Sequence, residues 1–333
     1  MKSLSHVLFL MIAAATISSF AAAADAPGYK VVHTWKLGGD GGWDYLTVDA
    51  EGRRLFIARS NRVMVVDEDS GKLVAEITDT PGVHGVALAP EFGRGFVSDG
   101  GEDKVATFDL KTLKVLSKVK VGTRPDAILY EPFAKRVFTF NASSHDTTAI
   151  DAAKGEVVGT LVLGGKPEYA ASDSKGTMWV NIEDTGEVVA FDPQKLMVKA
   201  RWKVEGCEEP TGLALDASSR RLFAGCSGSR KMAVIDADSG KLLAMLPIGD
   251  GCDGTAFDAD RKLAFASAGD GTITVVREDS PDKFAIAEIV KTQERARTIA
   301  LDPKTHEVFT ATAKVLPERK VEPDTFVVIE AGK

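Results

Sequence analysis

Short apolar runs alternate with tight polar turns along almost the whole chain. Typical stretches are "LTVDAEGRRLFIA", "LALDASSRRLFAG" and "IALDPKTHEVFTA", in which an apolar run ends in Asp and a polar turn leads into a second run. Runs of about four to eight residues bounded by turn residues are typical of half-buried β-strands. The pattern therefore predicts an all-β protein.

A bulky residue near the start of the second run recurs 40 to 45 residues apart. This marker of the repeat falls at Phe56, Phe96, Phe138, Trp179, Phe223, Ala264 and Phe309, with hairpins one residue shorter in the fourth and sixth units. Each unit holds four predicted strands, and units of this WD40-like length are typical of propeller blades. The seven markers predict a single seven-bladed β-propeller domain over residues 25–333.

The third strand of several units ends in the pattern D-x-x-x-G, as at Asp67–Gly71, Asp151–Gly155 and Asp236–Gly240. One such stretch could suggest a calcium loop. Its recurrence favours hairpin turns instead, because Asp accepts backbone hydrogen bonds in a turn and Gly adopts positive φ.

The seventh unit has no fourth-strand pattern after "TFVVIEAGK". The segment Tyr29–Gly39, "YKVVHTWKLGG", has that pattern at the other end of the chain. We expect this segment to complete the last blade and close the ring, which removes the exposed sheet edges of an open array.

The first residues predict export. Residues 1–24 combine Lys2, an apolar run over Val7–Phe20 and small residues at Ala22–Ala24, which is the pattern of a secretory signal peptide. We expect a periplasmic or secreted protein with no membrane span after signal removal. The net charge of −7 makes nucleic acid an improbable partner, because such binding usually needs a large basic surface.

The repeats resemble the YncE-like family of secreted bacterial proteins with YVTN-type β-propeller repeats. The resemblance lies in "VIDADSGKLLAMLPIG", "AIDAAKGEVVGTLVLGGKPE" and the strand starts at Pro125, Pro167 and Pro210, and it covers the chain after residue 24. It implies a propeller fold. Related propellers include secreted binding proteins, modules of respiratory enzymes and lactonases, so the resemblance leaves the activity open.

One polar residue leads into the first strand of every unit: Asp44, His84, Asp126, Glu168, Thr211, Asp253 and Arg297. In a propeller of this kind these loops reach the mouth of the central channel. We therefore predict a site for a small molecule or protein partner there, with Trp43, Arg124 and Lys166 as further candidates. The long connection Thr312–Thr325 is expected on the same face, where it could act as a lid.

Carboxylates that converge on one axis repel one another unless they are neutralised. Basic residues such as Arg297 could do this, and so could a divalent cation such as calcium, which favours several carboxylate oxygens. The candidate metal ligands are Asp126, Glu168 and Asp253.

Common catalytic motifs are absent from the sequence, including H-E-x-x-H and G-x-S-x-G. We therefore expect a secreted binding or scaffold protein. The alternative is a metal-dependent hydrolase of the lactonase type that uses the carboxylates of the channel. The ring lacks the Asn that related lactonase sites use beside acids. A role as redox partner of another enzyme rests on family context alone.

The chain contains three cysteines, and export makes a disulfide possible. If Leu213 lies opposite Ala224, then Thr211 lies opposite Cys226, and the loop carrying Cys207 can fold back over it. This register predicts a Cys207–Cys226 disulfide. Cys252 is the alternative partner, and a thiolate metal site is a third possibility.

Overall fold

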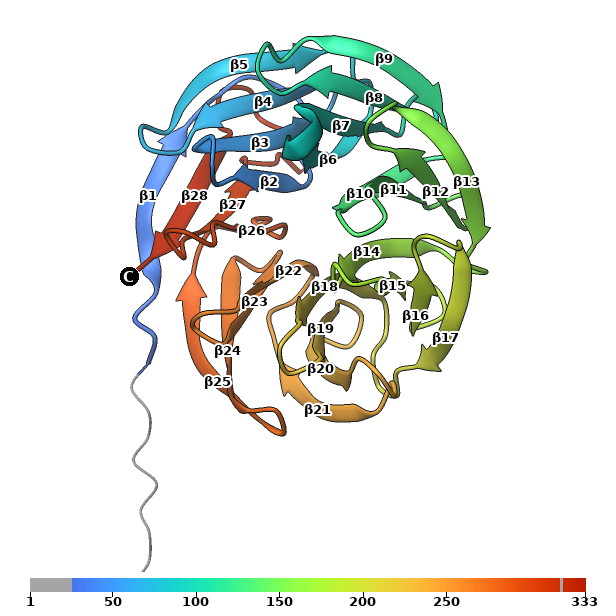
Figure 1. The fold of residues 1–333 in the computed structure, drawn as a ribbon. Helices are drawn as coiled ribbons and strands as arrows, with labels where there is room; N and C mark the ends of the chain where they lie inside the picture. The colour runs from blue at the N-terminus through green and yellow to red at the C-terminus, as the bar shows by residue number, and fades with distance from the viewer. Residues whose placement is uncertain (1–25, 318–319) are drawn as a thin grey trace, which may run out of the picture.

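Seven antiparallel four-stranded sheets are arranged as blades around a central channel (Figure 1). The computed structural model describes residues 26–317 and 320–333, so the predicted signal peptide lies outside the described residues. The prediction of an all-β, seven-bladed propeller is confirmed.

Each blade runs from an innermost strand beside the channel to an outermost strand at the rim. The first four blades comprise β2 (Leu46–Asp49), β3 (Arg54–Arg59), β4 (Arg62–Asp67) and β5 (Lys72–Thr78); β6 (Val83–Ala89), β7 (Arg94–Asp99), β8 (Lys104–Asp109) and β9 (Val115–Lys120); β10 (Pro125–Glu131), β11 (Arg136–Asn141), β12 (Asp146–Asp151) and β13 (Glu156–Val162); and β14 (Pro167–Ser172), β15 (Met178–Ile182), β16 (Glu187–Asp192) and β17 (Met197–Lys203). The last three comprise β18 (Pro210–Asp216), β19 (Arg221–Cys226), β20 (Lys231–Asp236) and β21 (Leu242–Pro247); β22 (Cys252–Asp258), β23 (Leu263–Ala268), β24 (Thr272–Ser280) and β25 (Lys283–Lys291); and β26 (Ala300–Leu301), β27 (Val308–Thr312), β28 (Val327–Gly332) and β1 (Lys30–Lys36). In the second blade a short 3₁₀ turn, η1 (Pro90–Phe92), forms the turn of the first hairpin, between β6 and β7.

The N-terminal strand completes the seventh blade. β1 pairs antiparallel with β28, from Lys30 opposite Gly332 to Lys36 opposite Val327. Figure 1 shows the blue β1 beside the red β28, at the rim of the molecule. The predicted closure of the ring by its two ends is confirmed.

The hydrophobic core lies between neighbouring blades, which explains why the sequence repeats a bulky residue. Phe56 of the first blade packs on Phe108 of the second, with ring centroids 5.8 Å apart, and Phe138 packs on Phe191 at the same distance. Trp179 is fully buried, and its indole Nε1 donates a 3.0 Å hydrogen bond to the Ala237 carbonyl.

The marker assigned to the sixth blade is wrong by one residue. In the fifth blade the marker Phe223 lies opposite Ala214, two residues before the Asp that ends the strand. The equivalent pair in the sixth blade is Phe265 opposite Ala256, whereas Ala264 lies opposite Phe257. The hairpin of the sixth blade is therefore of ordinary length, and only that of the fourth is short.

The recurrent turns have the predicted hairpin chemistry. Asp67 accepts a 2.9 Å hydrogen bond from the Ser70 amide, and Asp236 accepts one of the same length from Ser239. Gly71 and Gly240 have φ of 65° and 73°, the left-handed conformation that glycine adopts without steric cost.

The Cys207–Cys226 disulfide is present, and Cys252 is a buried free thiol. The strand register used for this prediction was right for one residue pair and wrong for another. Leu213 lies opposite Ala224 as expected, but Pro210 rather than Thr211 lies opposite Cys226. The difference arises from a bulge between Pro210 and Leu213. Over the described residues, no helix has the length and apolar character needed to cross a membrane.

Candidate functional site

Nine of the ten candidate residues line one cavity of about 240 Å³ at the mouth of the channel. They are Asp44, His84, Arg124, Asp126, Lys166, Glu168, Thr211, Asp253 and Arg297. The tenth, Trp43, lines a neighbouring cavity together with Arg297. The structure therefore brings the predicted ring together, while its role as a binding site stays a prediction.

A β-bulge accounts for the position of the ring residue in five blades. In the second to sixth blades the register of the innermost strand shifts at its start, and the ring residue lies within the shift, as His84 does between Val83 and Val86. A bulge bends a strand and redirects a side chain. In the first and seventh blades Asp44 and Arg297 precede the strand instead.

Three ring residues from the first three blades form a compact polar cluster. Nδ1 of His84 lies 2.6 Å from Oδ2 of Asp44 and 3.5 Å from Oδ1 of Asp126. Burial lowers the pKa of His84, but the hydrogen bond to Asp44 and the charge of Asp126 raise it, and the net shift is upward. Burial raises the pKa of both carboxyl groups against the opposing effect of His84.

The other acids of the cavity have basic partners. Nζ of Lys166 lies 2.8 Å from Oε1 of Glu168 and also contacts Glu183. Nε of Arg297 lies 3.0 Å from Oδ2 of Asp253. Burial and the charge of Asp126 raise the pKa of Glu168 to about 9, although Lys166 opposes this rise.

The expected metal set of Asp126, Glu168 and Asp253 is thus divided in the structure. Glu168 and Asp253 have their own cations, whereas Asp126 shares His84 with Asp44. Over the described residues, the one group of three with metal-ligand atoms close together is Asp44, His84 and Asp126, whose ligand atoms lie within 4.8 Å of one another.

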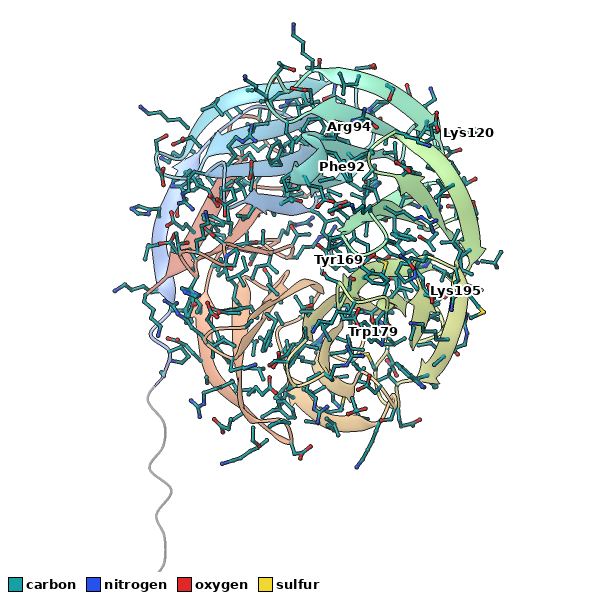
Figure 2. All side chains as sticks on the ribbon, viewed as in Figure 1. Phe92, Arg94, Lys120, Tyr169, Trp179 and Lys195 are labelled. Carbon is teal, nitrogen blue, oxygen red and sulfur yellow. A yellow bond between two sulfur atoms is a disulfide. The ribbon has the colours of Figure 1, made fainter. Side chains whose placement is uncertain are left out.

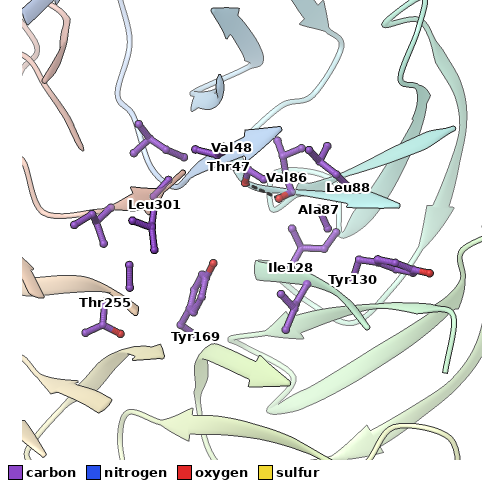
Figure 3. A pocket seen from close by; sticks show the side chains of 15 residues that line it. Thr47, Val48, Val86, Ala87, Leu88, Ile128, Tyr130, Tyr169, Thr255 and Leu301 are labelled. Atoms are coloured by element: carbon purple, nitrogen blue, oxygen red, sulfur yellow. Dashed lines mark hydrogen bonds between the residues drawn. The ribbon is translucent and has the colours of Figure 1, made fainter. Parts of the chain in front are cut away.

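Two tyrosines separate the mouth cavity from a deeper part of the channel. Tyr45 lines the mouth cavity and Tyr169 lines the deeper one, and their ring centroids lie 5.1 Å apart. Figure 2 shows Tyr169 beside the channel axis. The deeper cavity, of about 330 Å³, is lined by apolar side chains of the innermost strands, including Val86, Leu88 and Ile128 (Figure 3).

Thr211 occupies its ring position for a structural reason. Its side chain is buried, and its hydroxyl donates a 2.7 Å hydrogen bond to the Cys252 carbonyl of the next blade. The hydroxyl also lies 3.2 Å from the Gly225 carbonyl. Thr211 therefore joins two blades beneath the cavity.

The long connection after β27 lies beside the ring. Val315 and Val321 form an isolated antiparallel bridge, and both line the neighbouring cavity with Trp43, Arg295 and Arg297. Because Arg297 also lines the mouth cavity, the connection borders the candidate site. The predicted lid function stays a prediction.

Sequence reasoning missed Glu183 as a cavity residue. It directly follows β15, at the turn that leads to the third strand of the fourth blade. The available signal was the strand direction, because turns between second and third strands emerge on the same face as the ring. The first hairpin of that blade, which is one residue shorter than the others, gave no further indication that Glu183 lines the cavity.

Comparison of the chain with models of protein families and with curated proteins gives no match. The fold and the geometry of the cavity are therefore the basis for a functional assignment.

Proposed function

We propose that the protein is an extracytoplasmic binding protein of the YncE-like propeller kind, which holds a small polar ligand with an anionic group at the channel mouth. One observation carries the proposal. Equivalent positions from all seven blades converge on a single polar cavity. The disulfide supports an oxidising compartment.

The anionic group follows from the cations of the cavity. Lys166 and Arg297 contact acids of the ring. The guanidinium of Arg124 forms no ion pair with any other residue in the described part of the chain, and it lines the same cavity. It is therefore the side chain available for a carboxylate or phosphate, which a guanidinium binds in bidentate geometry. The small volume favours a compact metabolite, since drug-sized ligands occupy about 300–1,000 Å³.

Differential scanning fluorimetry with a library of small carboxylates, phosphates and sugar acids tests the proposal. A ligand at about 100 times its Kd stabilises the folded state by about 2.7 kcal/mol. We expect an anionic compound to raise the melting temperature of the wild type and not that of an Arg124→Gln, Arg297→Gln double variant. The control is Arg230→Gln, which removes an exposed arginine paired with Asp250. Equal shifts in the double variant and the wild type would place the site elsewhere.

A metal-dependent hydrolase of the lactonase type is the second candidate. The Asp44–His84–Asp126 cluster favours it, because a metal held by such a set can polarise a carbonyl and a free carboxylate can act as base. Titration of the acid released from aliphatic lactones, with and without added Zn²⁺, tests this activity. We expect any metal-dependent turnover to be lost in Asp44→Asn.

A further inference from the structure

The carboxylates that line the mouth cavity are neutralised unequally. Glu168 and Glu183 share the ammonium of Lys166, and Asp253 has the guanidinium of Arg297. The remaining two, Asp44 and Asp126, have only the imidazole of His84 within ion-pair distance among the described residues.

One imidazole cannot serve two carboxylates from the same atom. Nδ1 carries at most one proton, and of its two contacts the one to Asp44, at 2.6 Å, is the shorter. The carboxylate of Asp126, whose side chain is 14% exposed, accepts no hydrogen bond from any described residue at normal geometry. Two partly buried carboxylates thus contact one nitrogen at the channel mouth, while Arg124, Lys166 and Arg297 act on them only from beyond ion-pair distance. A bound cation would compensate this charge more completely.

A second observation at the same place also indicates a ligand. Tyr45 is 6% exposed and lines the mouth cavity, yet its hydroxyl has no hydrogen-bond partner among the described residues. A buried phenol ordinarily finds such a partner. The hydroxyl can therefore donate a hydrogen bond to a molecule held in the cavity.

We propose that Asp44, His84 and Asp126 bind one divalent transition-metal ion, with Zn²⁺ as the best match, and that its open coordination positions face the cavity. Imidazole is a preferred ligand of Zn²⁺, whereas Ca²⁺ requires six to eight oxygen ligands. Two carboxylates balance the charge of the ion. Three protein ligands leave a position for water or for the anionic group of the bound molecule, with the Tyr45 hydroxyl as a donor nearby.

The local packing allows His84 to serve as a ligand. A Cβ atom placed on Gly100 would lie 2.8 Å from Cδ2 and 3.0 Å from Nε2 of His84. The imidazole therefore rests against a backbone that has no side chain, with Nδ1 directed at the two carboxylates. Zinc ligands lie about 2.0–2.2 Å from the ion, so tetrahedral donors are about 3.4 Å apart. The three ligand atoms already lie within 4.8 Å of one another, so small side-chain rotations would bring them to this spacing.

The inference rests on the proposed function for the location of the site, and isothermal titration calorimetry tests it separately. Untagged protein comprising residues 25–333 is stripped with EDTA, dialysed at pH 7.5 and titrated with ZnCl₂ and, in parallel, with CaCl₂. We expect one Zn²⁺ per chain with micromolar or tighter affinity, and at least about tenfold weaker binding in Asp44→Asn, His84→Gln and Asp126→Asn. Co²⁺ gives an independent readout, because its visible spectrum reports the ligand geometry and should change in His84→Gln.

Two variants at the other end of the channel are matched controls. His306 hydrogen-bonds Asp258 through Nδ1 at 2.9 Å, and Asp49 accepts a backbone hydrogen bond in a hairpin, so neither contributes to the cavity. His306→Gln and Asp49→Asn should bind Zn²⁺ like the wild type. Absence of Zn²⁺ binding, or unchanged affinity in His84→Gln, would overturn the inference. Anionic ligands that stabilise EDTA-treated protein would then still support the proposed function.

Discussion

Acidic residues lie at both ends of the innermost strands, but their hydrogen-bond partners differ between the two ends. At the end away from the mouth, a carboxylate in six of the blades accepts a hydrogen bond from an amide of the following turn: Asp49, Glu131, Asp173, Asp216, Asp258 and Asp302. Asp216 also accepts a 2.6 Å hydrogen bond from Nζ of Lys262. Burial raises the pKa of Asp216, but Lys262 and the turn serines lower it overall.

At the mouth, the acids come from different blades and meet only when the ring closes. The pKa values of Asp44, Asp126 and Asp253 are raised mainly by burial, and neighbouring carboxylates add to the effect. Hydrogen-bond partners within the same turn thus make a carboxylate a stabilising element. Incompletely partnered carboxylates from separate blades remain available to a ligand.

The largest predicted effect concerns the end away from the mouth. Asp216→Ala should lower the free energy of unfolding by about 3 kcal/mol, because Asp216 is buried and holds both its own turn and Lys262. Urea unfolding followed by circular dichroism measures this. Asp238→Ala, which removes an exposed partner of Arg220, should cost less than about 1 kcal/mol. Similar losses in the two variants would contradict the assigned role of Asp216.

The second prediction is a pH dependence that originates at the mouth. Because the folded-state pKa of Glu168 is raised to about 9, its contribution to stability is greatest at acidic pH and declines as the pH rises towards 9. At about 1.36 kcal/mol per pH unit, metal-free protein should lose about 2 kcal/mol between about pH 7 and pH 8.5. In Glu168→Gln the decline should be smaller. A wild-type decline no steeper than that of the variant would show that Glu168 is not responsible.

The third prediction is a gain of stability from neutralising the ring. At pH 8 the free energy of unfolding of the triple variant Asp126→Asn, Glu168→Gln, Asp253→Asn should be about 1 kcal/mol higher than that of the metal-free wild type. The variant removes like charges that face one another. Chemical denaturation with EDTA present checks this. The same variant should lose any stabilisation by Zn²⁺, because it removes Asp126 from the Asp44–His84–Asp126 cluster. A destabilisation as large as that of Asp216→Ala would mean that the two ends of the channel do not differ.

The smallest predicted effect on stability comes from Gly100→Ala. The new methyl group meets the imidazole of His84, so we expect about tenfold weaker Zn²⁺ binding with a stability change below about 1 kcal/mol. Calorimetry and urea unfolding measure the two quantities. Gly269→Ala is the control, because its nearest neighbour is a carbonyl oxygen at 3.4 Å. Equal Zn²⁺ affinity in both variants would show that the fit around His84 is unimportant.

The sequence predicted the fold well because repetition amplifies a weak local signal. Seven copies of one strand pattern located the blades, and the unmatched segment at Tyr29–Gly39 located the closing strand. The sequence was ambiguous where a strand assignment depended on a shift of one residue. Ala264 and Phe265 are adjacent apolar positions, and strand pairing alone shows that Phe265 is the marker. The bulge after Pro210 likewise changed which residue faces Cys226.

The ring of candidate residues could be predicted because each occupies the same place in its repeat. Their partners could not be predicted, because they depend on side chains from neighbouring blades. Lys166 turns to Glu168 and to Glu183, a residue from a different turn. This pairing gives Glu168 a cation of its own, whereas Asp126 lies beside His84 and Asp44.

Native mass spectrometry of the exported protein, purified without chelator, tests most directly whether the channel mouth is a binding site. The wild type should carry a stoichiometric adduct, of metal or of metal with a small anion, that dissociates on activation or with EDTA. The triple variant Asp126→Asn, Glu168→Gln, Asp253→Asn should carry none, since it removes three of the acids that line the cavity. The same adduct on both proteins, or bare wild-type protein, would contradict the assignment of function to the mouth of the channel.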